Sequence, residues 1–173
     1  MRIRRGGPAD ADAVIALFDE AVAWMAARGQ TGQWGTEPMS RNAKMVARVR
    51  EWAAGDGLWM AEDGGAPVGA LVVGERPEHV HPVDEPELYV ELLLSSRARA
   101  GERIGARLIE HAVALAHEAG VPLLRVDCWA GAPKLVGFYA AQGFVRDGTF
   151  EVRGWPGQVF SMRLGHQPGT AAR

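Results

Sequence analysis

The sequence predicts one α/β domain with a mixed, mostly antiparallel sheet of six to seven strands and helices on both faces. Three observations support this fold class. A strand, a helix and another strand follow each other between residues 89 and 128, and such a β–α–β unit sets its two strands in parallel. Two earlier strands, 58–62 and 67–73, are joined by Asp63-Gly64-Gly65, which is typical of a hairpin. A chain of 173 residues suits one domain with a large core.

The first part of the chain predicts a short strand and two helices. Residues 1–5 form the strand, which Gly6-Gly7-Pro8 ends. Apolar residues at helical spacing then predict a helix that runs to about Arg28, where Gly29 stops it. A second helix is expected from an N-cap at Ser40 through Ala54. The aperiodic residues between these two helices predict a loop.

The second part predicts the rest of the sheet. An apolar strand at 89–94 leads through a loop into a long amphipathic helix that Gly120-Val121-Pro122 ends. A strand at 123–128 follows, and a helix then begins at Pro133 and stops at Gln142-Gly143. Phe144 opens a strand, turns are expected at Asp147-Gly148 and at 155–158, and the final strand covers 159–164. We therefore assign residues 1–164 to the domain and expect residues 165–173 to form a disordered tail.

Composition and charge exclude several classes of function. A net charge of -2 argues against nucleic acid as a partner, and no apolar stretch approaches the length of a membrane span. The single cysteine, Cys128, rules out a disulfide within the chain, and the N-terminus lacks the apolar core of a signal peptide, so we expect a cytoplasmic protein. His79 and His81 have no third ligand at an obvious spacing, which argues against a metal site. A homodimer is compatible with the sequence.

The loop after the strand at 89–94 has the character of an anion site. Residues 97–107 contain four arginines, with Gly101 and Gly105 between them, at the start of a helix. The first N–H groups of a helix have no partner inside it, the helix dipole favours an anion, and glycine allows the backbone to approach closely. The alternative is a solvated helix start that is simply basic. By itself, the pattern is a weak signal for a phosphate site.

A second pattern connects this loop to a known family. Leu135-x-x-Phe138-Tyr139-x-x-x-Gly143-Phe144 follows the strand at 123–128, and with the order of the elements it resembles the GCN5-related N-acetyltransferase (GNAT) family. The loop itself matches in part, because Gly101 and Gly105 fit common variants of the family's pyrophosphate loop. The resemblance implies the GNAT fold over residues 1–164, with acetyl-CoA as the cofactor.

The resemblance also implies which residues hold acetyl-CoA. Pantetheine would lie between the diverging strands, and the pyrophosphate would lie on the loop and the first turn of the helix. The implied cofactor-binding residues are Leu93, Leu94, Ser95, Arg99, Ala100, Gly101, Arg103, Ile104, Gly105, Ala106 and Phe138. Two positions depart from the family: Arg103 stands where a glycine is usual, and Ala132 where many members have an asparagine. If position 103 needs a positive φ, arginine is strained there, unless its charge meets a phosphate.

Two residues are candidates for catalysis. Tyr139 matches the family's tyrosine that protonates the leaving thiolate, and a tyrosine keeps its proton at neutral pH. Glu91 is an acid within the apolar run YVELLL, on the face that strand alternation assigns to Tyr89 and Leu93, and is our candidate for the base that takes a proton from the amine. Tyr139 as a packing residue, and Glu91 at a solvated edge or paired with a cation such as Arg125, are the alternatives.

The acceptor site is expected among loops. Trp34, Trp129 and Trp155 are the candidate substrate-binding residues, supplied by the 29–40 loop, the end of the strand at 123–128 and the turn at 155–158. Acids near these loops, at Glu37, Asp84, Glu85 and Glu87, suggest a cationic partner. The function predicted is transfer of an acetyl group to the primary amine of a small molecule. The alternatives are a peptide or protein amine as acceptor, or a degenerate domain that binds acyl-CoA as a sensor without turnover.

Overall fold

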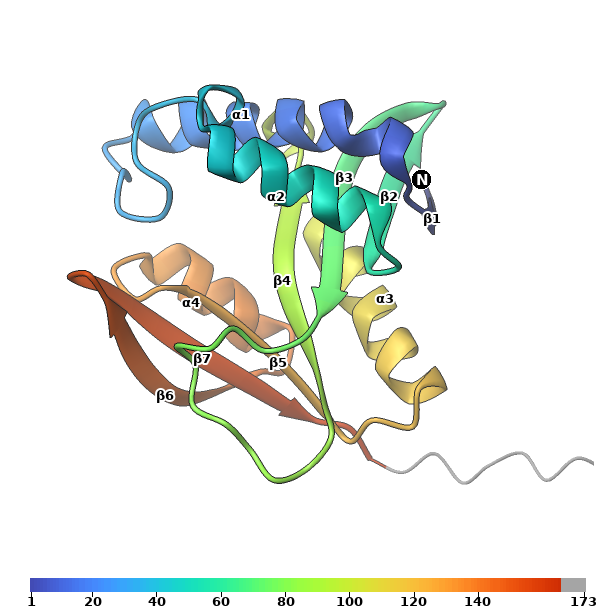
Figure 1. The fold of residues 1–173 in the computed structure, drawn as a ribbon, viewed down its shortest axis with the longest axis vertical. Coiled ribbons are helices and arrows are strands. Elements are labelled where there is room, and N and C mark those ends of the chain that lie inside the picture. The colour runs from blue at the N-terminus through green and yellow to red at the C-terminus, as the bar shows by residue number, and fades with distance from the viewer. Residues whose placement is uncertain (166–173) are drawn as a thin grey trace, which may run out of the picture.

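The computed structural model describes residues 1–165, so all but the first residue of the expected tail at 165–173 lies outside the described residues. Seven strands form one sheet in the order β1-β2-β3-β4-β5-β7-β6 (Figure 1). They are β1 (Arg2–Arg5), β2 (Leu58–Asp63), β3 (Ala66–Gly74), β4 (Glu87–Ser95), β5 (Leu123–Trp129), β6 (Val145–Val152) and β7 (Trp155–Arg163). The helices are α1 (Ala11–Ala26), α2 (Ala43–Ala54), α3 (Ile104–Glu118) and α4 (Pro133–Ala141).

The strand pairing confirms the mixed sheet. β4 and β5 are parallel, with Glu87 opposite Leu123 and Val90 opposite Val126, and the other neighbouring strands within residues 1–165 pair antiparallel. The pairing of β4 with β5 stops at Val90, although β4 continues to Ser95. The two strands therefore diverge over their C-terminal halves, and a space opens in the middle of the sheet.

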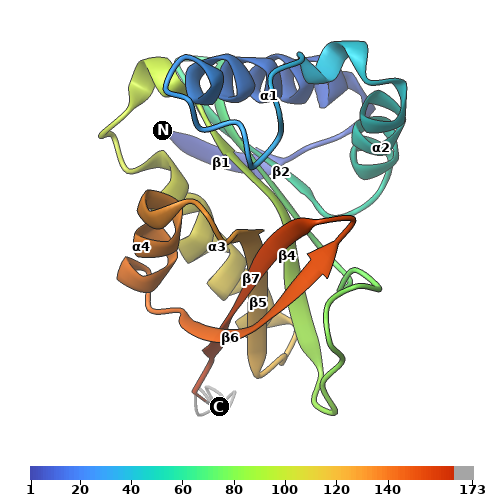
Figure 2. The same cartoon turned by 90° about the vertical axis from the view of Figure 1, so that its left-hand side faces the viewer.

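The helices cover both faces of the sheet, as predicted. Helices α1 and α2 lie on one face, whereas α3 and α4 lie on the other (Figures 1 and 2). One apolar core joins α1 and α2 to β2, β3 and β4 through residues such as Phe18, Val49 and Leu92, and a second joins α3 and α4 to the opposite face through Leu108, Tyr139 and others. The cores hold the diverging strands between two layers of helix.

The start of α2 differs from the prediction. Met39–Arg41 form a 3₁₀ turn, and the helix begins at Ala43. The Asn42 side chain accepts a 3.1 Å hydrogen bond from the Met45 N–H, so Asn42 and not Ser40 is the N-cap. Met39 is buried in the core beneath α1, which pulls the chain inward before the helix can start.

The turns predicted near the C-terminus were wrong. Asp147-Gly148 is part of β6, where the pairing with β7 shifts register, and residues 155–158 belong to β7. The hairpin turn is Arg153-Gly154, at φ 50° and 81°. Two consecutive residues with positive φ are what a two-residue hairpin loop requires, so the tight turn forms there.

Candidate active site

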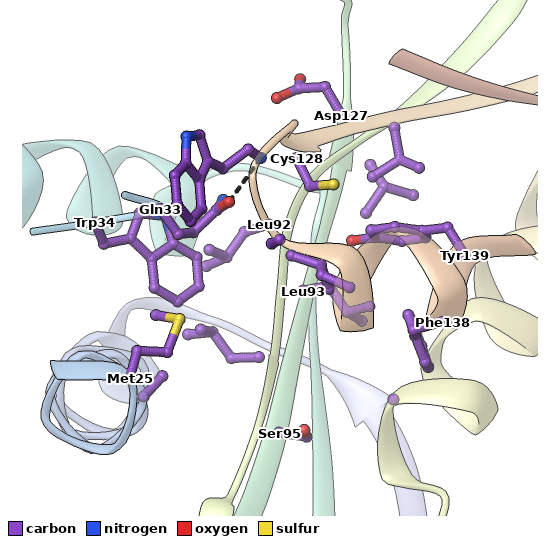
Figure 3. A pocket seen from close by; sticks show the side chains of 18 of the residues that line it. Met25, Gln33, Trp34, Leu92, Leu93, Ser95, Asp127, Cys128, Phe138 and Tyr139 are labelled. Carbon is purple, nitrogen blue, oxygen red and sulfur yellow. Dashed lines mark hydrogen bonds between the residues drawn. The ribbon is translucent and has the colours of Figure 1, made fainter. Parts of the chain in front are cut away.

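A cavity of about 920 Å³ occupies the space between the diverging strands β4 and β5. Figure 3 shows Tyr139 and Phe138 on one side, Trp34, Gln33 and Met25 on the other, and Leu92 and Leu93 between them. All the residues predicted to act in catalysis, cofactor binding or substrate binding line it: Trp34, Glu91, Leu93, Leu94, Ser95, Arg99, Ala100, Gly101, Arg103, Ile104, Gly105, Ala106, Trp129, Phe138, Tyr139 and Trp155. The acids Glu37, Asp84, Glu85 and Glu87 do not.

One end of the cavity is formed by the start of α3. Gly101 has a φ of 92°, and Arg103, the N-cap of α3, has a φ of 59° in the left-handed region. This conformation costs an arginine about 1–2 kcal/mol relative to a right-handed one. The backbone needed at position 103 is therefore one that glycine adopts without strain, although the sequence has arginine there. The Arg103 side chain is exposed and lies 3.5 Å from Glu110.

Gly105 allows α3 to approach α4. A Cβ atom at position 105 would lie 3.3 Å from Cζ of Phe138, closer than most Cβ contacts. Phe138 packs in turn against Tyr139, with their ring centroids 5.2 Å apart. The first turn of α3, where backbone N–H groups have no partner inside the helix, therefore sits directly beside the aromatic residues of α4.

Tyr139 and Cys128 form an apolar part of the cavity wall. Burial, with the nearby Cys128 and Asp127 groups, raises the pKa of the Tyr139 hydroxyl well above its usual range. Burial also raises the pKa of the Cys128 thiol to about 12. At neutral pH the tyrosine therefore keeps the proton that it would donate, and Cys128 stays a thiol, a poor nucleophile.

Glu91 is held by α2. One carboxylate oxygen, Oε2, accepts hydrogen bonds from Arg48 Nη2 at 2.7 Å and from Trp52 Nε1 at 3.0 Å. The pairing of β3 with β4 shifts between Val72 and Val73, which makes Glu91 the extra residue of a β-bulge. Leu93 packs toward α3, whereas Glu91 faces α2, so the shared face expected for these two residues was wrong. The bulge interrupts the alternation on which that expectation rested.

Asp127 is a second acid on the cavity wall, and the sequence analysis did not select it. Its carboxylate accepts a 2.5 Å hydrogen bond from the Tyr89 hydroxyl. Removal from water raises the pKa of the Asp127 carboxyl, against smaller opposing effects of that hydrogen bond and of His79. Within residues 1–165, no arginine or lysine forms an ion pair with it. Asp127 is thus a desolvated carboxylate that no arginine or lysine within residues 1–165 pairs with.

An aromatic wall leads away from Asp127. His79, which lines the cavity with Asp127, lies with its ring centroid 4.6 Å from that of Phe150, and the Phe150 centroid lies 5.8 Å from that of Trp155. Trp155 Nε1 donates a 2.6 Å hydrogen bond to the carbonyl of Gly32. The wall therefore joins the 75–86 loop, the β6–β7 hairpin and the loop after α1, which are far apart in the sequence.

A buried arginine fixes this wall to the sheet. Arg125 is fully buried; its guanidinium donates to the His81 carbonyl at 3.0 Å and to Glu87 at 3.1 Å, and its Nε lies 3.3 Å from Asp147. These partners lie on the 75–86 loop, β4 and β6. The same side chain thus anchors three of the segments around the end of the cavity where Asp127 lies, which we call the acid end.

Comparisons with known proteins identify the family. The model of the acetyltransferase (GNAT) family matches residues 16–144. The chain belongs to the GNAT family. Curated proteins give no match. Solved structures share the fold at low identity, among them a ribosomal-protein-alanine N-acetyltransferase from Brucella melitensis (22% identity, TM-score 0.64, covering 95% of this chain and 100% of that one) and a GNAT acetyltransferase from Listeria monocytogenes (21%, 0.69, 94% of each).

Membership of the GNAT family makes this chain an acetyl-CoA-dependent N-acetyltransferase. A candidate acetyltransferase from Salmonella typhimurium, whose structure includes its cofactor acetyl-CoA, shares the fold with a TM-score of 0.68 at 15% identity, over 99% of this chain and 98% of that one. None of the helices within residues 1–165 is both long and apolar enough to cross a membrane.

The residues of this chain fit acetyl-CoA. The open edge of β4 beyond Val90 offers backbone groups to an amide-containing chain, and the first turn of α3 offers N–H groups to a pyrophosphate. A Cβ at Gly105 would narrow the space beside Phe138. Arg99 is already engaged, because it donates to Asp63 at 2.7 Å and to Glu102 at 2.6 Å. Arg99 therefore holds the loop in place through these two carboxylates, without a bound ligand.

The signal for Asp127 was present in the sequence. It is an acid in the strand LLRVDC, which is apolar apart from Arg125 and Asp127, and a similar signal selected Glu91 in YVELLL. What separates them is the partner of each carboxylate, Arg48 for Glu91 and Tyr89 for Asp127. These partners come from distant parts of the chain, and the sequence pattern does not identify them.

Proposed function

We propose that this enzyme acetylates the primary amine of a small molecule, with Asp127 as the general base and Tyr139 as the general acid. The observation that carries the proposal is the pair of groups on β5 and α4: a half-buried carboxylate that forms no ion pair with an arginine or lysine within residues 1–165, and a buried hydroxyl whose pKa is raised. Both line the cavity between β4 and β5. Bound acetyl-CoA supplies the activated acetyl thioester.

Asp127 is the better candidate for the base. An amine is protonated at neutral pH and must lose a proton before it can attack. A carboxylate takes that proton more readily when desolvation raises its pKa, and a nearby anion also attracts the ammonium group. Glu91 stays a prediction, but its carboxylate is already neutralised by Arg48 and bonded to Trp52. That pairing occupies its Oε2 oxygen.

In this proposal Tyr139 supplies the proton that the leaving thiolate needs. Its ring packs between Phe138, Phe144 and Phe160, which fixes the direction of the hydroxyl. Figure 3 shows the hydroxyl directed toward the part of the cavity that contains Cys128 and Leu93. A neutral hydroxyl in an apolar wall is a proton donor and does not compete for the amine's proton.

The loop after α1 favours a small acceptor. Gln33 Oε1 accepts a 2.7 Å hydrogen bond from the Trp129 N–H, and Trp155 Nε1 donates to the Gly32 carbonyl. A Cβ at Gly32 would lie 2.1 Å from the Trp129 ring, so the loop packs tightly on that ring. These contacts tie the loop after α1 to the end of β5 and to the β6–β7 hairpin, beside the proposed acceptor position. An extended peptide would have to break them, whereas a compact amine would not.

Release of free thiol from acetyl-CoA, measured over a panel of amines, tests the proposal. The wild-type chain should turn over at least one primary amine, and Asp127→Asn and Tyr139→Phe should each lose about 10²-fold or more in kcat/KM. Glu91→Gln is the matched control and should retain most of the activity. Loss in Glu91→Gln, with Asp127→Asn near wild type, would return the role of base to Glu91.

Thermal shift with coenzyme A separates the remaining functions. Stabilisation by coenzyme A without turnover of any amine would support an acyl-CoA sensor. Turnover of peptide amines, with no small amine accepted, would support a peptide or protein amine as the acceptor. Either result would overturn the proposed function.

A further inference from the structure

The acid end of the cavity has a distinct distribution of charge. The cationic side chains on the cavity wall are Arg97, Arg99, Arg103 and Lys134, on the segment between β4 and α3 and on α4, together with His79 if it is protonated. Within residues 1–165, the loop after α1, the β6–β7 hairpin and the end of β5 contribute no lysine or arginine to it. The arginines and the lysine thus lie on the elements that would hold the phosphates of acetyl-CoA, and the acceptor side lacks them.

The same acceptor side is rich in flat rings. The rings of His79, Phe150 and Trp155 form a row of tilted contacts, with interplanar angles of 45° and 35°, and all three line the cavity together with Asp127. Across the cavity, Trp34 packs edge-on against Phe18, with centroids 4.6 Å apart. Aromatic faces attract both other rings and an ammonium group. A ligand in this space would meet an anion at one point and ring faces around it.

We propose that the natural acceptor is a primary amine attached to an aromatic body without a carboxylate, with its ammonium group against Asp127 and its ring against the wall of His79, Phe150 and Trp155. This inference rests on the proposed function, because it assumes that the amine is acetylated in this cavity. An amino acid would place its carboxylate beside Asp127, where no lysine or arginine is available to balance it. A polyamine carries further ammonium groups, whereas the acids on the cavity wall within residues 1–165 are Asp127 and Glu91, and Glu91 already pairs with Arg48.

The rings of Trp129 and Trp155 are held in place by their neighbours. A Cβ atom built at Gly32 would lie 2.1 Å from the Trp129 ring, and one built at Gly131 would lie 2.4 Å from it, so this ring is fixed between two segments. Trp155 is fixed by its hydrogen bond to Gly32. A rigid aromatic wall favours a rigid partner, because a flexible chain loses more conformational entropy on binding.

A matched set of amines tests this inference. Phenethylamine, phenylalanine, n-hexylamine and spermidine are compared as acceptors with saturating acetyl-CoA. We expect kcat/KM for phenethylamine to exceed that for each of the others at least tenfold. If phenylalanine gives the same kcat/KM as phenethylamine, the site accepts a carboxylate. If n-hexylamine gives the same kcat/KM, the aromatic side chains do not select for an aromatic acceptor. Either result overturns the inference, while the proposed function stands.

Variants locate the selectivity. Phe150→Leu should reduce the ratio of kcat/KM for phenethylamine to that for n-hexylamine about fivefold to tenfold, because it removes the ring between His79 and Trp155. This ratio does not depend on how much of the variant is folded. Val145→Ala, on an exposed position of the same strand, should leave the ratio unchanged. An unchanged ratio in Phe150→Leu would place the ring of the acceptor elsewhere. If no amine of any class releases thiol, the proposed function itself fails.

Discussion

The two ends of the cavity are built differently. The cofactor end comes mainly from β4, α3, β5 and α4, which follow one another in the chain, and its features are backbone features such as an open strand edge and a helix start. The acid end, where we propose that the acceptor binds and which we call the acceptor end below, comes from the loop after α1, the 75–86 loop, the end of β5 and the β6–β7 hairpin. Its features are side chains. A site built from backbone groups keeps its hydrogen-bonding groups when side chains are replaced, whereas a site built from side chains changes with each replacement.

This difference explains how far each end tolerates change. Backbone N–H groups at the start of α3 remain when side chains change, so Arg103 can replace a glycine at a limited cost. At the acceptor end each role depends on one side chain, such as the carboxylate of Asp127. The predictions that follow measure the contrast between the two ends.

The largest effect is expected for Asp127→Asn. The amide cannot take a proton, so kcat/KM should fall about 10²–10⁴-fold, while KM for acetyl-CoA stays within about twofold. The same change should raise Tm by about 2–4 °C at pH 7, because it removes a desolvated charge and leaves the Tyr89 hydroxyl an acceptor. Steady-state kinetics with thermal unfolding checks both. Retained activity in Asp127→Asn would show that Asp127 is not the general base.

Tyr139→Phe should lower kcat about 10²-fold, because the leaving thiolate loses its proton donor. The ring and its packing against Phe138 and Phe160 remain, so unfolding should change little. Single-turnover kinetics measures the chemical step directly. A variant with wild-type kcat would leave Tyr139 with a packing role only.

The pH profile should show the raised pKa of Asp127. The base acts in its charged form, so kcat/KM falls as pH decreases through that pKa, and the acid limb should lie above the ordinary carboxyl value of about 4. With acetyl-CoA saturating, the limb should be absent from the residual activity of Asp127→Asn. A limb at the same pH in both enzymes would assign it to another group.

A smaller effect is expected for Gly105→Ala. Its methyl group would lie 3.3 Å from the Phe138 ring and push α3 from α4, so KM for acetyl-CoA should rise about threefold to tenfold with kcat little changed. Combining it with Phe138→Leu, which makes room, should recover part of the loss. Gly137→Ala, on α4 with open space around it, is the control.

The smallest effect is expected for Arg103→Gly. Glycine adopts the φ of 59° without strain, so the free energy of unfolding should rise by about 1 kcal/mol at most. If the arginine meets a phosphate, KM for acetyl-CoA should rise a few-fold and depend less on salt. Chemical denaturation and titration with acetyl-CoA measure the two effects. An unchanged KM would show that the charge is incidental.

The sequence by itself determined the order of the elements and the parallel pair of β4 and β5. These features follow from short-range patterns, because apolar periodicity, glycines and prolines fix local conformation. The anion site at the start of α3 and the catalytic role of Tyr139 stay predictions. The resemblance to the family, which usually has a glycine at position 103, raised the question of a positive φ there, and Arg103 has a φ of 59°. Local patterns misplaced the cap of α2 and the last hairpin turn, where burial of Met39 and the register of β6 with β7 decided.

Only the tertiary structure distinguishes the surroundings of the two acids. Glu91 and Asp127 both lie in largely apolar strands, and the sequence pattern does not identify the partner of either carboxylate. A bulge in β4 and the approach of α2 give Glu91 an arginine, whereas Asp127 faces Tyr89 and the aromatic wall. The charge on a desolvated carboxylate depends on its partners, and those of both acids lie tens of residues away in the chain. The proposed acceptor end is therefore a property of the folded molecule, whereas the proposed cofactor end is built largely from elements that follow one another in the chain.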